Sequence, residues 1–113
     1  MASVAECDEA LHRLADRLAA ASEDARKRAS LDRTMTCTLR DLGVTFAGRL
    51  LDGQLLDIRQ VQGVTPAKVR MTLSSDDLLA LVDGKLNMGS AFATGRVKID
   101  ASVLDLVKLR SIF

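Results

Sequence analysis

The feature that most constrains the fold is a change in the spacing of apolar residues along the 113-residue chain. Between residues 4 and 18 apolar side chains recur every three or four positions, which is typical of an amphipathic helix. Between residues 34 and 73 the spacing falls to two, which is typical of strands with one buried face. The chain is the length of one domain, so we predict that residues 1–113 fold as a single unit.

The first helix is predicted to begin at Val4, because Ser3 and Glu6 have the spacing of a capping box. Its apolar stripe consists of Val4, Cys7, Leu11, Leu14 and Leu18. The polar run at residues 22–30 continues no such stripe. We interpret it as a helix end or a linker.

Five strands are predicted, over residues 34–39, 44–50, 56–60, 67–73 and 97–101. In the third of these, Leu56 and Ile58 are expected to face the core together. A three-residue loop at 51–53 is predicted to precede it, with Phe46 opposite Ile58 and with Arg49 and Asp57 on the outer face. A two-residue loop would direct charged side chains inward.

Helical spacing returns after residue 74. Ser74 and Ser75 are both N-cap candidates for a short helix that ends near Gly84. A second short helix is predicted to end at Gly95, and Ser102 with Asp105 caps a third that runs to the C-terminus. The order of elements predicts an α+β fold, a five-stranded mainly antiparallel sheet with helices covering one face.

Composition argues against several functions. The net charge is +1 and the chain has three Phe but no Tyr or Trp, which disfavours nucleic acid as a partner. One histidine and two separated cysteines predict no metal site, and no glycine motif predicts a cofactor. No nucleophile motif occurs, and helix capping accounts for Asp76 and Asp77, so no catalytic residue is predicted.

The N-terminus has no basic segment followed by an apolar one, and no apolar run is long enough to span a bilayer. We therefore expect a cytoplasmic protein. The last third of the chain is apolar on more than one side of each short helix. Such helices either form an ordinary core or surround a cavity, and periodicity alone favours the core.

Residues 74–113 resemble the C-terminal half of the sterol carrier protein 2 family. The most specific positions are Gly84-Lys85-Leu86-Asn87, Ala91-Phe92, Gly95 and Lys98-Ile99. The resemblance implies a sterol-carrier-like sheet that is covered by helices and encloses an apolar tunnel. It implies that lipid contacts are made by Phe46, Ile58, Leu78, Leu81, Val82, Phe92, Val103, Leu106 and Val107.

Arg110 stands where some members of that family have a glutamine inside the tunnel, so it either points to solvent or pairs with an acidic ligand group. The resemblance implies non-catalytic binding of a sterol, fatty acid or other lipid, with transient contact with a membrane surface. The alternative is a ligand-free structural or dimerisation module of the same fold, with a homodimer as its marker.

Overall fold

The computed structural model describes residues 1–20, 24, 32–63 and 65–110, with side chains up to Lys108. Apart from Asp24, the polar run at 22–30 lies outside the described residues, as does the predicted end of the last helix at 111–113. The described elements are α1 (Val4–Ala19), β1 (Asp32–Leu39), β2 (Val44–Leu51), β3 (Gln54–Val61), β4 (Val69–Leu73), α3 (Ser75–Val82), α4 (Met88–Ala93), β5 (Lys98–Asp100) and α5 (Val103–Arg110).

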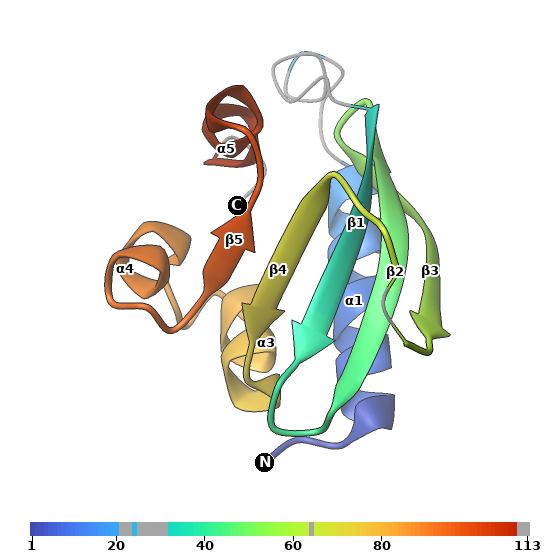
Figure 1. Ribbon diagram of the computed structural model, residues 1–113, viewed down its shortest axis with the longest axis vertical. Helices are drawn as coiled ribbons and strands as arrows, with labels where there is room; N and C mark the ends of the chain where they lie inside the picture. The colour runs from blue at the N-terminus through green and yellow to red at the C-terminus, as the bar shows by residue number, and fades with distance from the viewer. Residues whose placement is uncertain (21–23, 25–31, 64, 111–113) are drawn as a thin grey trace.

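The strands form one sheet in the order β3-β2-β1-β4-β5. β1 and β4 are parallel, whereas the other neighbouring strands are antiparallel. This arrangement confirms the predicted α+β class and its five-stranded, mainly antiparallel sheet. α1 and α3 lie side by side against one face, while α4 and α5 lie beyond the β5 edge (Figure 1).

The first helix forms as its sequence predicts. The Glu6 amide donates to Ser3 Oγ and the Ser3 amide donates to Glu6 Oε1, both at 3.1 Å, which completes the capping box. The helix buries Cys7, Ala10, Leu11, Leu14 and Leu18. On the facing strand Met35, Cys37 and Leu39 are buried, as predicted, but Thr36 on the other face is buried as well, so β1 is covered on both sides at that point.

The predicted register between the second and third strands is wrong. The loop has two residues, Asp52 and Gly53, both with positive φ, and Leu51 pairs with Gln54. A bulge then shifts the pairing, so that Phe46 lies opposite Gln60 and not opposite Ile58. A two-residue loop without a bulge would direct charged side chains inward. The bulge prevents this, because its one extra residue returns an apolar position to the inner face.

The extra residue is Asp57, whose φ of 56° is unusual for a side chain other than glycine. Leu55 is buried and Ile58 is partly buried, whereas Leu56 is exposed, contrary to its predicted inward orientation. Arg49 contacts Asp32 at 2.8 Å. The bulge therefore shifts the pattern of inward-facing residues in β3 by one position, so that Leu55 faces inward before it and Ile58 faces inward after it.

Candidate functional site

A narrow apolar cavity lies between the two covering helices and the inner face of the sheet. Its walls consist of Leu11, Leu14 and Leu18 from α1, of Leu78, Leu81 and Val82 from α3, and of the strand residues Met35, Cys37, Phe46, Ala47, Gly48, Leu50, Leu55, Ile58 and Met71. None of these side chains is charged at neutral pH. The cavity is therefore suited to an alkyl group and to no ion.

The cavity volume is about 30 Å³. Pockets that hold drug-sized ligands measure roughly 300–1,000 Å³. In this closed state the interior has room for a group the size of a water molecule, and an acyl chain can enter only if the walls move apart.

An open groove adjoins the cavity at the C-terminal ends of α1 and α3. Leu14, Leu18 and Leu81 line both spaces and so form the wall between them. The outer side of the groove is formed by Arg17 and by residues 84–88. Displacement of three leucine side chains would join the groove to the interior.

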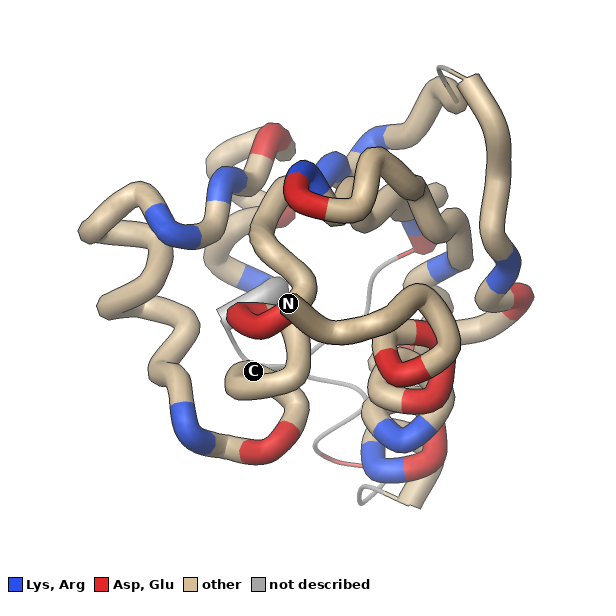
Figure 2. Tube along the Cα trace, turned by 90° about the horizontal axis from the view of Figure 1, so that it is seen from below, with Lys and Arg blue, Asp and Glu red and all other residues tan. Residues whose placement is uncertain are grey.

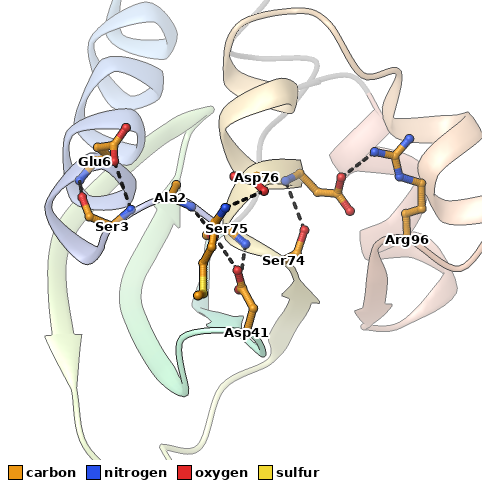
Figure 3. A network of polar contacts seen from close by, with 10 residues as sticks. Ala2, Ser3, Glu6, Asp41, Ser74, Ser75, Asp76 and Arg96 are labelled. Carbon is orange, nitrogen blue, oxygen red and sulfur yellow. Dashed lines mark hydrogen bonds and ion pairs between the residues drawn. The ribbon is translucent and has the colours of Figure 1, made fainter.

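A polar cluster fixes the N-terminal ends of the two helices (Figure 3). The Asp41 carboxylate accepts the Ser75 amide at 2.9 Å and the Ser75 hydroxyl at 2.5 Å. The Ser75 hydroxyl in turn accepts the Ala2 amide at 3.0 Å. Because Ala2 precedes α1 and Ser75 begins α3, this cluster holds both helices to the turn after β1.

The opposite ends of the same helices are joined by contacts that are more exposed. Arg13 Nη1 lies 2.9 Å from Asp83 Oδ1, and both side chains are more than one-third exposed. Arg17 donates a hydrogen bond of 2.7 Å to the carbonyl oxygen of Val82. Exposed ion pairs contribute little to stability. At the other end Ser75 is fully buried and takes part in three hydrogen bonds, so we expect the Arg13–Asp83 end to separate at a lower cost in free energy.

Hydrogen bonds from Ser75 hold the pKa of the Asp41 carboxyl below its ordinary value of 3.8. The stabilisation from this carboxylate is therefore complete above about pH 4 and is lost as the pH falls through the lower folded-state pKa. We expect urea unfolding in acid to show a loss of stability that Asp41→Asn lacks, with the two proteins converging at low pH. An unchanged pH profile in Asp41→Asn would contradict this role.

Five of the predicted lipid contacts, Phe46, Ile58, Leu78, Leu81 and Val82, meet at the cavity. The structure does not bring the later ones there, because α4 and α5 lie beyond the β5 edge (Figure 1). Phe92, Val103 and Val107 are 47%, 79% and 60% exposed, and Leu106 is half-buried. The side chain of Arg110 lies outside the described residues.

The sequence does not predict that α1 forms part of the cavity wall. Leu11, Leu14 and Leu18 were recognised as one apolar stripe, but a stripe shows burial and not whether a cavity lies beneath it. Leu55 lies inward because the two-residue loop at Asp52 and Gly53 pairs it with the buried Leu50, whereas the predicted three-residue loop would not. The extent of the cavity is thus a property of the packed helices and sheet.

The thiol of Cys37 lies in the cavity wall and is 3% exposed. Burial raises its pKa from 9.0 to about 12, and burial followed by the charge of Asp41 raises the pKa of Cys7 to about 11. Only the thiolate form of a cysteine reacts readily. Near neutral pH the fraction of Cys37 in the thiolate form is therefore about a thousandfold lower than that of an ordinary cysteine.

We therefore expect the Cys7→Ser variant, which retains only Cys37, to react with dithiobis(nitrobenzoate) at least about a thousandfold more slowly when folded than in urea. The reaction is followed by absorbance. Rapid labelling of the folded variant would show that the cavity is open to solvent.

Within the parts of the chain that the structure describes, no three His, Cys, Asp or Glu side chains are grouped so that they could hold a metal ion. No helix among the described residues has the length and apolar character needed to cross a bilayer.

Comparison with known proteins finds a matching family and similar folds. The sequence profile described as the SCP-2 sterol transfer family matches residues 11–113. Sterol carrier protein 2-like 2 from Aedes aegypti superposes with a TM-score of 0.70 at 17% identity, over 98% of this chain and 100% of that one. The palmitated form of that protein gives a TM-score of 0.68 at 18% identity, over 91% and 89% of the two chains.

A stereoselective inverting sec-alkylsulfatase from Pseudomonas sp. is also similar, with 26% identity and a TM-score of 0.64. The match covers 88% of this chain but only 15% of the sulfatase, so this chain corresponds to a small part of that enzyme. A sequence search of curated proteins found no significant match. The profile match spans nearly the whole chain and the fold agrees with it, and the chain therefore belongs to the SCP-2 sterol transfer family.

Proposed function

We propose that this protein binds the acyl chain of a lipid in the cavity between α1, α3 and the sheet and carries it without chemical change. The observation that supports this most strongly is the uniformly apolar lining of that cavity. Removal of an alkyl chain from water stabilises its complex by about 0.8 kcal/mol per methylene. No polar group in the cavity has to lose its hydration in exchange.

Binding by this mechanism requires the cavity to expand. The groove beside it marks the place of entry, because Leu14, Leu18 and Leu81 alone line both spaces. The contacts described at that end include the exposed Arg13–Asp83 pair and a hydrogen bond from Arg17 to Val82. A slender acyl chain needs less expansion than a rigid sterol, and a protein of the same fold has been solved in a palmitated form.

A chain-length series tests this function. Delipidated protein is titrated calorimetrically with straight-chain fatty acids that differ by one methylene. We expect a single site whose affinity rises about fourfold per methylene until the expanded cavity is full. Absence of binding, or an affinity independent of chain length, would contradict uptake into the interior.

A further inference from the structure

The groove that adjoins the cavity is positively charged. Among the described residues that line it, Arg17 and Lys85 carry a positive charge and none is acidic. Asp83, close to Lys85 in the sequence, is paired with Arg13 at 2.9 Å, and neither Asp83 nor Asp16 lines the groove. Along α1 as a whole acidic and basic positions are intermixed (Figure 2), so the excess of positive charge is a local property of the groove.

The groove also continues the apolar surface of the cavity outward. Leu14, Leu18 and Leu81 line both spaces, and the half-buried Leu86 and Met88 line the groove but not the cavity. The volume is about 450 Å³ in the groove and about 30 Å³ in the cavity. The path from the interior to the surface thus changes from narrow and apolar to wide and cationic. This arrangement suits a ligand with an alkyl tail and a negatively charged head group.

The two cations come from the ends of the two covering helices. Arg17 lies in the last turn of α1, and its Nη2 donates a hydrogen bond of 2.7 Å to the carbonyl oxygen of Val82. This bond holds the guanidinium beside the groove, and a guanidinium has five N–H donors, so one acceptor does not exhaust it. Lys85 follows the end of α3, and within the described residues its ammonium group forms no ion pair. A side chain that is already held in place loses less conformational entropy when it binds a ligand.

We propose that Arg17 and Lys85 bind the anionic head group of the ligand whose acyl chain enters the cavity, so that the protein selects an ionised single-chain lipid over a neutral one such as a sterol. This inference rests on the proposed uptake of an acyl chain. The head group stays in the open groove, where it keeps part of its hydration and gains the attraction of two cations. An exposed ion pair changes an affinity by about fivefold at most, so two pairs amount to about tenfold. The hydroxyl group of a sterol carries no charge and gains none of this attraction.

Two ligands with the same tail and different head groups test the site. Delipidated protein is titrated calorimetrically with dodecanoate and with dodecanol at about pH 8, where the carboxyl group is ionised. The readout is the ratio of the two affinities, because a change in the cavity or in stability affects both ligands alike. We expect wild type to bind dodecanoate about tenfold more tightly than dodecanol, and we expect added salt to lower this ratio. The double variant Arg17→Gln/Lys85→Gln should bring the ratio to about one.

The matched control is Arg59→Gln/Lys98→Gln, which changes the net charge by the same amount. Arg59 is also an exposed arginine that donates to a carbonyl oxygen, that of Asp57, and Lys98 is an exposed lysine. Neither lines the cavity or the groove, so this variant should keep the wild-type ratio. Dodecyl phosphate serves as a second anion. Whichever anion binds more tightly identifies the head group that the groove selects, and both should lose affinity in the Arg17→Gln/Lys85→Gln variant.

Failure of the head-group site and failure of lipid uptake give different results. If wild type binds dodecanoate and dodecanol equally, or if the control lowers the ratio as much as the groove variant does, the head-group site is refuted while uptake stands. Binding of none of the three ligands would refute uptake itself and the head-group site with it.

Discussion

Replacement of Leu78 by alanine is expected to lower the free energy of unfolding by about 3 kcal/mol. Leu78 is 2% exposed and forms part of the cavity wall, so truncation removes buried methyl groups and enlarges an existing void. The matched control is Leu104→Ala, the same chemical change on a helix but at a position 64% exposed, where we expect a change within about 0.5 kcal/mol. Urea unfolding at neutral pH measures both.

The same variant also reports on the ligand. If an acyl chain fills the space left by Leu78, a saturating fatty acid should restore much of the lost stability. A ligand at about a hundred times its dissociation constant contributes about 2.7 kcal/mol. Failure of fatty acid to stabilise Leu78→Ala, when wild type binds it, would place the bound chain elsewhere.

Leu81→Asp is expected to weaken fatty-acid binding by at least about tenfold. Leu81 lines both the cavity and the groove, so the new carboxylate would stand in the path of the acyl chain and would lose its hydration when the chain passes. Leu79→Asp is the control, because Leu79 is a half-buried leucine of the same helix that lines neither space.

Comparison of these two variants distinguishes an effect on entry of the acyl chain from an effect on the stability of the protein. Both introduce a carboxylate at a partly buried position of α3, so both should unfold at similar, lowered urea concentrations. Only Leu81→Asp should lose binding in the calorimetric titration. Equal losses of binding in the two variants would show that the effect comes from general destabilisation of α3.

Much of the fold could be predicted from the sequence, because it depends on local patterns. The capping box of Ser3 and Glu6, the N-cap at Ser74 and the left-handed conformation of Gly84 are each set by a few neighbouring residues. The register of β3 is different. The two-residue loop sets it at the start of the strand, and the bulge at Asp57 shifts it afterwards. The alternation of apolar residues gives no sign of the inserted residue.

The site was less predictable than the fold. The family resemblance implies that apolar residues of α3 and the sheet line the cavity, and it implies the same for Phe92, Val103, Leu106 and Val107. Sequence shows that these side chains are apolar, but only the positions of α4 and α5 in the structure show that Phe92, Val103 and Val107 are exposed. The pairing of Asp105 with Arg33, over 72 positions of sequence, fixes the orientation of α5.

The most direct test of the account locates the bound lipid. Delipidated protein is mixed with one equivalent of ¹³C-labelled palmitate, and intermolecular nuclear Overhauser effects are recorded. The account predicts contacts between the acyl chain and the methyl or ring protons of Leu14, Leu78 and Phe46, which surround the cavity. Contacts confined to Val103, Leu104 and Val107 would contradict it, since the chain would then lie on the surface and the cavity would stay closed.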